Sequence, residues 1–429
     1  MTRKKTSNRL ALTVVTTIFF MWGFLTVMND ILIPHLKSIF NLSYAGTMLI
    51  QFMFFLAYFI MSMPSGKIIS MFGYKNSIII GLFVTGIGAL LFYPAAAIPS
   101  YPLFLGAFFI LATGITVLQV AANPYVSLLG PSKTASSRLN LAQAFNSVGT
   151  MIAGPLGGML ILSTTVLGAS KVAEMSQAQK LAYQAQQAQT VQWPYIGFAL
   201  ILFALGVFVY FFNLPEVVSE DELEEKQEKV EKYSYSEALK HRHLLLGVVG
   251  IFMYVGAEVT IGSFMVNFIS LPSIGDISQN TAAQYLSLYW GGAMVGRFIG
   301  SALLQKLDSR KLLGIFASIS AGLVLITMIT TGKVAMWAIL AVGLFNSIQF
   351  PNIFTLGIEG MGKLTEKASS LLIMAIVGGA LIPVIQGVIA DHVGIHHAYI
   401  LPLLCYVYIV YYGFKGSKIK SKPQTAQAS

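Results

Sequence analysis

The sequence predicts an all-α membrane protein with twelve transmembrane helices in two pseudo-symmetric bundles of six. Three observations support this fold class. The 429 residues are 55% hydrophobic and only 10% charged, whereas a soluble domain carries about 25% charged residues. Apolar runs long enough to cross a bilayer, which takes about 20 residues, recur along the whole chain. The basic residues are segregated to one side of the spans that these runs define.

The apolar runs place the twelve spans in order along the chain, with short loops between most of them. The spans are expected at residues 9–36, 43–70, 75–95, 101–129, 137–165, 193–214, 242–271, 280–305, 310–330, 333–360, 366–391 and 396–415. The first run is too long for a cleavable signal peptide and also contains Asp30.

The distribution of Lys and Arg predicts that both termini are cytoplasmic. With this layout, all of the 27 Lys and Arg residues but Lys37, Lys171, Lys180 and Lys333 fall at or near one face. That asymmetry is what the positive-inside rule describes for a bacterial inner-membrane protein. The net charge of +10 is dispersed among loops, so no nucleic-acid partner is expected.

Two polar stretches interrupt the spans and suggest the domain boundaries. Residues 215–241 hold a dense charge run and are predicted to be a cytoplasmic linker between an N-terminal bundle, 1–214, and a C-terminal bundle with a basic tail, 242–429. Residues 166–192 are rich in Ala and Gln and are expected to form a short helix on the outer surface.

The two halves resemble each other at an offset of about 227–230 residues, which indicates a duplicated six-span unit of the kind found in carriers that rock two halves about a central site. The matching positions are Gly66 with Gly296, Pro124 with Pro351, Gly130 with Gly357, and Asp30 approximately with Glu258.

Asp30 is a carboxylate inside the first span, where a charge costs about 2.5–3.5 kcal/mol on insertion scales. Thr26, Asp30 and Pro34 recur every four residues and share one helix face. Two interpretations remain open. Asp30 binds a coupling ion or substrate in a wet cavity, or it caps a kinked helix end near Pro34.

Carboxamides, carboxylates and a phenol gather near the middle of several spans. Amides both donate and accept, which suits the hydroxyls of a neutral sugar, and no Lys or Arg is expected at mid-depth to bind an anion. The competing interpretation is that these amides hold helices together. The candidate residues are Asn29, Gln119, Asn123, Gln143, Asn146, Tyr254, Glu258, Asn346 and Gln349.

Other chemistries are not indicated by the sequence. No P-loop, HExxH motif or nucleophile elbow is present, so an enzyme is not expected. Cys405 is the single cysteine, which rules out an intramolecular disulfide. His392, His396 and His397 lie beside Asp391, but solvated interfacial histidines are the expected interpretation, and no metal site is predicted.

Several blocks resemble the fucose–galactose–glucose symporter family of the major facilitator superfamily, most closely the bacterial glucose/galactose porters. The similarity extends through nearly all the spans. The blocks are Asn29–Leu32, Gln119–Tyr125, Arg138–Ser147, Tyr254–Glu258 and Ser347–Pro351. The resemblance implies two six-helix bundles that alternate between outward and inward openings.

The resemblance also implies roles for individual residues. The fucose carriers place a proton-titrating Asp where this chain has Asp30, and a Glu where it has Gln119, which cannot titrate. Gln143 and Asn146 match family sugar-contact positions. Glu258 stands where the fucose carriers have Gln, which leads us to expect that the second acid has moved to the other half.

The sequence therefore predicts a monomeric importer of a neutral hexose, glucose or galactose, driven by symport with a proton or Na⁺ and needing no further cofactor. Asp30 and Glu258 are the candidate cation-coupling residues, and the polar set above is the candidate sugar site. A drug–proton antiporter of the same superfamily and a non-transporting sugar sensor are the alternatives.

Overall fold

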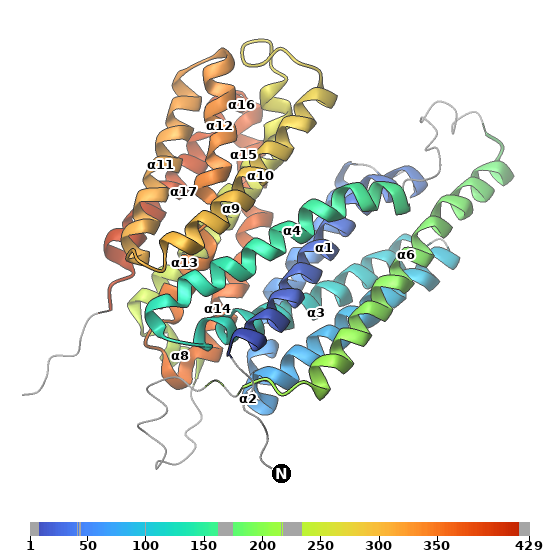
Figure 1. Ribbon diagram of the computed structural model, residues 1–429. Helices are drawn as coiled ribbons and strands as arrows, with labels where there is room; N and C mark the ends of the chain where they lie inside the picture. The colour runs from blue at the N-terminus through green and yellow to red at the C-terminus, as the bar shows by residue number, and fades with distance from the viewer. Residues whose placement is uncertain are drawn as a thin grey trace, which may run out of the picture.

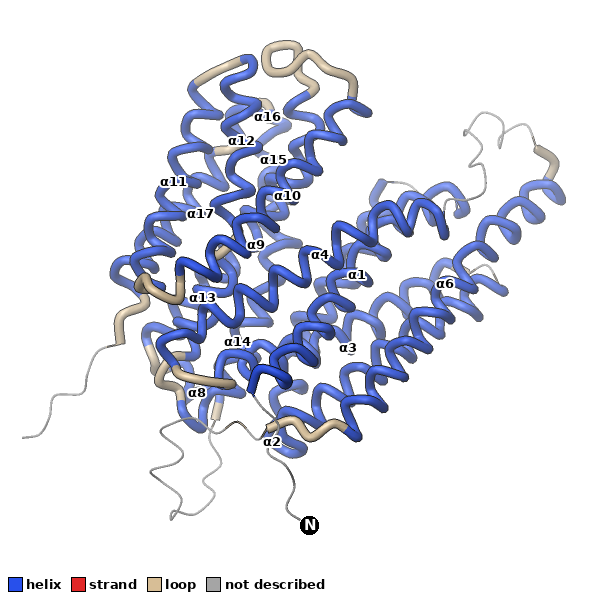
Figure 2. The backbone as a smooth tube through the Cα atoms, in the orientation of Figure 1, coloured by secondary structure: helices blue, strands red, loops and turns tan. Residues whose placement is uncertain are grey.

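The described part of the chain is helical from end to end (Figures 1 and 2). The computed structural model describes residues 8–40, 42, 44–98, 100–161, 175–215, 217 and 234–419. The predicted linker 215–241 lies mostly outside the described residues. At its end, the short helix α8 (Tyr235–Leu239) begins with a capping box between Ser234 and Glu237.

The first bundle consists of five helical segments that make six crossings. They are α1 (Asn8–Phe40), α2 (Tyr44–Ala97), α3 (Tyr101–Leu128), α4 (Ala135–Ile161) and α6 (Gln177–Phe211), with a short 3₁₀ turn, η1 (Ser132–Thr134), before α4. A straight helix with the 54 residues of α2 would be about 80 Å long. It instead folds back at Gly73, whose φ of 73° is accessible to glycine at low cost, and so crosses twice.

The second bundle also has six crossings, three of them interrupted. The uninterrupted helices are α9 (Arg242–Ile269), α10 (Gln279–Leu303) and α11 (Ser309–Ile329). The interrupted crossings are α12 (Gly332–Asn346) with α13 (Gln349–Ile358); η2 (Gly362–Leu364), α14 (Thr365–Met374), η3 (Ala375–Val377) and α15 (Gly378–Val393); and α16 (Ile395–Ala398), α17 (Ile400–Tyr411) and η4 (Tyr412–Gly416).

The twelve predicted spans correspond to these crossings. Nine helices among the described residues are long and apolar enough to cross a membrane. Because α2 is one of the nine but crosses twice, and because the more polar α4 and α10 are not among them, the total is twelve. The predicted fold class is confirmed, and the chain is a multi-pass membrane protein.

The largest departure from the predicted boundaries is at α6. The segment expected as a separate surface helix is continuous with the sixth span from Gln177 onward. Ser176 and Gln179 form a capping box at its start, and Ala and Gln have high helix propensity, so the helix simply extends beyond its apolar part. Residues 166–174 of the expected surface helix lie outside the described residues.

The two bundles meet at one end of the molecule and diverge at the other (Figure 1). The end where they meet, near the start of α1, is called the closed end here, and the opposite end is called the open end. At the closed end, hydrogen bonds cross from α3 and α4 to α10, α13 and α14. This interbundle seal consists of Ser136–Thr355 at 2.6 Å, Ser137–Ser301 at 2.7 and 2.9 Å, Asn140–Asn352 at 3.0 Å and Ser369–Val120 O at 2.8 Å.

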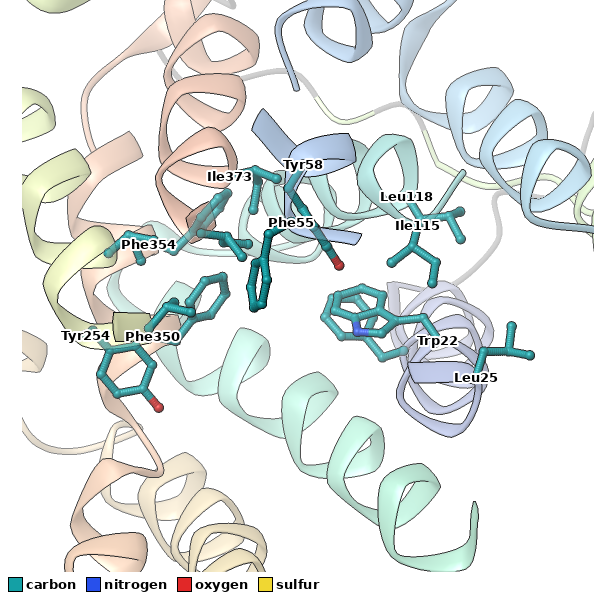
Figure 3. Packing of buried hydrophobic residues seen from close by; sticks show 14 of the residues in the cluster. Trp22, Leu25, Phe55, Tyr58, Ile115, Leu118, Tyr254, Phe350, Phe354 and Ile373 are labelled. Atoms are coloured by element: carbon teal, nitrogen blue, oxygen red, sulfur yellow. The ribbon is translucent and has the colours of Figure 1, made fainter. Parts of the chain in front are cut away.

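An aromatic layer continues the contact between the bundles. Figure 3 shows Phe55 and Tyr58 of α2 lying between Trp22 of α1 and Phe350 of α13. The ring of Phe55 reaches the backbone of the second bundle, since a Cβ added to Gly379 would lie 2.8 Å from it. Packing between the halves therefore extends from the seal to the edge of the central cavity.

Candidate functional site

A cavity of about 360 Å³ lies between the two bundles, and both contribute to its wall. Its lining residues come from α1, α2 and α3 on one side and from α9 and α10 on the other: Thr26, Asn29, Asp30, Ile33, Ile50, Gln51, Phe54, Phe55, Phe108, Val259, Gly262, Ser263, Leu286 and Trp290. A second cavity of about 700 Å³ lies at the closed end, beyond the interbundle seal.

Asp30 is the one acidic residue among the described residues that line the central cavity, and its side chain is exposed there. Within the described part of the chain, its carboxylate has no hydrogen-bond or salt-bridge partner. Ile33, Ile50 and Phe108 line the cavity beside it. A carboxylate in such surroundings is stabilised by taking up a proton or a cation.

Asn29 supports the same wall from a buried position. Its Oδ1 accepts a hydrogen bond from Tyr195 Oη at 3.0 Å. Its Nδ2 is buried and has no acceptor among the described residues. A buried donor without an acceptor costs about 1–3 kcal/mol, so a ligand oxygen at this wall of the cavity would be favourable.

The candidate amides of α3 lie deeper, about three helical turns nearer the closed end than the cavity-lining Phe108. Gln119 donates from Nε2 to Tyr58 Oη at 2.6 Å, and Figure 3 shows that hydroxyl directed towards Trp22. Asn123 is fully buried, and neither polar atom of its side chain has a partner among the described residues. Gln119 lies just before the seal contact at Val120, and Asn123 lies one turn beyond it, at the level of the seal.

The candidate amides of α4 are buried against α1 and the facing bundle. Asn146 donates from Nδ2 to the carbonyl oxygen of Phe19 at 2.9 Å, and a Cβ on Gly23 would collide with Asn146. Gln143 is 6% exposed. Neither residue lines the cavity in this conformation.

The candidates of the second bundle form a buried network of their own. Tyr254 Oη donates to Glu258 Oε1 at 2.7 Å and lies 3.1 Å from the carbonyl oxygen of Asn346. The Asn346 side chain bonds the hydroxyls of Tyr289 and Tyr406, each at 2.7 Å. Gln349 donates to Ser320 Oγ at 3.1 Å. These groups cross-link helices within the bundle, and none of them lines the cavity.

The structure thus brings only Asn29 and Asp30 of the candidate set to the cavity surface. The sequence also indicates Gln51 as a polar residue at membrane depth and Trp290 as a side chain able to stack on a sugar, and both line the cavity. Ser263, which lines it too, is the residue that sequence reasoning missed. Gly262 and Ser263 follow Glu258 by about one helical turn. This spacing indicates that they lie on the same side of the span as Glu258, and it is the signal from which Ser263 could be identified.

The expectation that no basic residue reaches mid-depth was wrong for Arg297. The sequence groups Arg297 with Lys306, Arg310 and Lys311 in the basic turn that follows the eighth span. In the structure it lies inside α10, half-buried, and its guanidinium donates to Ser147 Oγ of the facing bundle.

Comparison with known proteins agrees with this architecture. The family model described as "Major Facilitator Superfamily" matches residues 11–375. The chain is 50% identical to the glucose/galactose transporter of Brucella abortus over 95% of its length and 94% of the relative's. It is 47% identical to a putative glucose/galactose transporter of Helicobacter pylori, over 97% and 98% of the two chains.

Fucose carriers are also similar. The L-fucose-proton symporter of Escherichia coli is 36% identical over 92% of this chain and 90% of its own. The solved structure of FucP in the outward conformation superposes with a TM-score of 0.87 at 34% identity, covering 95% of this chain and 99% of that chain. The chain is therefore a membrane transporter rather than an enzyme, and it belongs to the fucose/glucose/galactose symporter family of the major facilitator superfamily.

Proposed function

We propose that this transporter imports a neutral hexose, glucose or galactose, together with a proton or Na⁺, by alternating access. The observation that carries the proposal is Asp30, a carboxylate without a partner among the described residues, on a cavity shared by both bundles. The names of the relatives at 47–50% identity support the choice of sugar. The sealed end and the open end correspond to one of the two states that such a mechanism requires.

The proposed orientation places the closed end in the cytoplasm, with both termini. The exposed Lys133, in η1, and Lys306, in the turn after α10, lie at that end, as the positive-inside rule favours. In this orientation the central cavity faces outward, ready to receive sugar, and the interbundle seal blocks release into the cell.

The cavity suits a hexose in size and lining. Ligand pockets typically have about 300–1,000 Å³, and this one has about 360 Å³. Asn29, Gln51 and Ser263 supply polar groups for the hydroxyls. Trp290 is 40% exposed and supplies an aromatic face for the apolar side of the ring.

The deeper amides then form the second part of the path. Gln119, Gln143 and Asn146 lie between the cavity and the seal, and Asn123 lies at the level of the seal, so sugar would meet them as the bundles rock and the seal opens. Tyr254, Glu258, Asn346 and Gln349 would contribute from the second bundle in the same step. Their present hydrogen bonds to one another hold these side chains until sugar hydroxyls replace them.

Coupling follows if the ion and sugar favour the same transition. An ionised Asp30 makes closing the cavity unfavourable, because a bare carboxylate would be removed from water. A proton or Na⁺ removes that penalty, and the ion thereby biases the equilibrium between the two openings.

Counterflow in proteoliposomes tests the proposal. Vesicles loaded with unlabelled hexose should take up labelled glucose and galactose, and proton and Na⁺ gradients applied separately should identify the coupling ion. A protein that binds hexose without counterflow would be a sensor, and one that exchanges no hexose would refute sugar transport.

A further inference from the structure

Arg297 connects the two bundles from inside α10. Its Nη1 donates to Ser147 Oγ and, at 3.5 Å, to the carbonyl oxygen of Gln143, both on α4 of the first bundle. The residue is half-buried. A guanidinium removed from water needs acceptors and a counter-charge, so these contacts with α4 stabilise the state in which the bundles are closed at this end.

The same side chain also reaches a break in the second bundle. Helix α12 ends at Asn346 and α13 begins at Gln349. Arg297 Nε donates to the carbonyl oxygen of Ser347 at 3.4 Å. The approach is close because the preceding residue is Gly296, where a Cβ would lie 2.4 Å from the carbonyl oxygen of Leu344.

Glu258 lies near the same break. Tyr254 Oη, which bonds the Glu258 carboxylate at 2.7 Å, lies 3.1 Å from the carbonyl oxygen of Asn346, the residue before Ser347. No ion pair joins the Glu258 carboxylate and the Arg297 guanidinium among the described residues, but Tyr254 and Ser347 bring both side chains to the same break. Arg297 thus has acceptors in the facing bundle and a nearby carboxylate, not paired with it, in its own bundle.

We propose that Glu258 and α4 compete for Arg297, so that Arg297 is the positioning residue that links the polar network of the second bundle to the interbundle seal. In the sealed state Arg297 is bound to α4 and to the break and, within the described part of the chain, forms no ion pair with Glu258. When the bundles separate at this end, it loses α4 and turns to Glu258. The inference rests on the proposed alternating access but requires neither sugar nor coupling ion.

The competition fixes the direction of two substitutions. Glu258→Gln removes the counter-charge that remains in the open-seal state, so it should favour the sealed state. Ser147→Ala removes an acceptor present only in the sealed state, so it should favour opening. A hydrogen bond to a charged group is typically worth enough for about a tenfold shift in such an equilibrium.

A cysteine at Ala144 provides the readout. Ala144 is fully buried and shares its face of α4 with Asn140 and Ser147. In a Cys405→Ala background, Ala144→Cys is the one thiol of the chain. Its labelling by a hydrophilic maleimide, with the protein in lipid nanodiscs, requires the seal to open. We expect about tenfold slower labelling in Glu258→Gln and about tenfold faster labelling in Ser147→Ala.

A double-mutant cycle separates the proposed link from independent effects. In an Arg297→Gln background, Glu258→Gln should no longer change the labelling rate, because the cation for which Glu258 competes is gone. Ser301→Ala is the matched control for Ser147→Ala. It weakens the seal away from Arg297, so its effect should add to that of Glu258→Gln in either background.

Persistence of the Glu258→Gln effect without Arg297 would overturn the inference, as would faster labelling in Glu258→Gln alone. Arg297→Lys keeps the charge and serves where Arg297→Gln does not yield folded protein. In the Arg297→Lys background the Glu258→Gln effect should persist, because a cation remains, and its absence would count against the link. Since labelling involves no sugar, a failure of hexose counterflow would leave this result standing and would refute only the proposed substrate.

Discussion

Asn140 of α4 and Asn352 of α13 meet between the two bundles, with Asn140 Nδ2 donating to Asn352 Oδ1 at 3.0 Å. Neither residue has any exposed surface. The bond joins an amide of the first half to an amide of the second, so it exists only while the closed end stays closed. The presence of this hydrogen bond therefore distinguishes the sealed state from the state in which the closed end has opened.

Asn352→Ala is expected to shift the equilibrium towards an open seal by about 1 kcal/mol, or about fivefold, the usual net value of one hydrogen bond. Asn140 keeps its bond to the carbonyl oxygen of Ser136 at 2.8 Å, which limits the effect. Spin labels at Lys133 and Lys306, on opposite sides of the cavity at the closed end, should report a larger population at long distance.

Asn76→Ala is the matched control. Asn76 is an exposed amide of α2 whose Nδ2 bonds the carbonyl oxygen of Phe72 in the same helix. Its loss should leave the distance distribution unchanged. An identical distribution in Asn352→Ala and the parent protein would show that this amide pair does not contribute to the seal.

Arg138 stabilises the connection between α3 and α4. Its guanidinium donates to the carbonyl oxygens of Val126, Ser127, Gly130 and Pro131 at 2.5–3.1 Å and to Thr134 Oγ1 at 2.6 Å. The end of a helix leaves carbonyls without intrahelical donors, and this planar group satisfies several of them at once.

Arg138→Ala should therefore destabilise the protein by about 2–3 kcal/mol, seen as a lower melting temperature in detergent by intrinsic fluorescence. Arg138→Lys should lower the melting temperature by less than Arg138→Ala does. It should still lower it, because an ammonium offers fewer donors than a guanidinium and does not hold them in a fixed geometry. Lys133→Ala, an exposed residue of the same connection, should have no effect. Equal melting temperatures for all variants would contradict the role assigned to Arg138.

The fold could be predicted from the sequence because length and apolarity of a span determine that it crosses the bilayer. The direction in which an amide side chain points could not be predicted from the sequence. Asn346 and Gln349 have the composition of sugar ligands, but they bond Tyr289, Tyr406 and Ser320 within their own bundle. Spacing along one helix shows which residues share a face, not which neighbour that face meets.

Arg297 illustrates the same limit for charge. The sequence places it near the end of the eighth span, where an exposed basic residue is typical. It is half-buried instead. Gly296 lets α10 approach the break after Asn346, where the carbonyl oxygen of Ser347 accepts a hydrogen bond from Arg297. Pro351 has no N–H to bond the carbonyl oxygen of Ser347 four residues before it, so the sequence carries a signal for the break, but spacing along one helix does not show that Arg297 supplies the donor.

Asp30→Asn should abolish concentrative hexose uptake while counterflow continues. The substitution keeps the shape of the side chain but removes the charge that a coupling ion would neutralise, so ion binding no longer biases the two openings. In energised proteoliposomes the ratio of internal to external sugar should fall to about 1. Asp391→Asn, at an exposed carboxylate near the end of α15, is the control and should still concentrate sugar. Uphill uptake by Asp30→Asn would exclude this residue as the coupling site.

Trp290→Ala should weaken hexose binding by about 1 kcal/mol, or about fivefold in Kd, the typical value of an aromatic packing contact. The indole lines the cavity opposite Asp30 and packs over Gly262, where a Cβ would lie 3.2 Å from the ring. Trp290→Phe should retain part of the affinity, because a smaller aromatic face remains. Trp193→Ala provides the matched control, since Trp193 is 75% exposed on α6 and does not line the cavity. Isothermal titration with glucose and galactose measures all three variants, and unchanged affinity in Trp290→Ala would place the sugar elsewhere in the cavity.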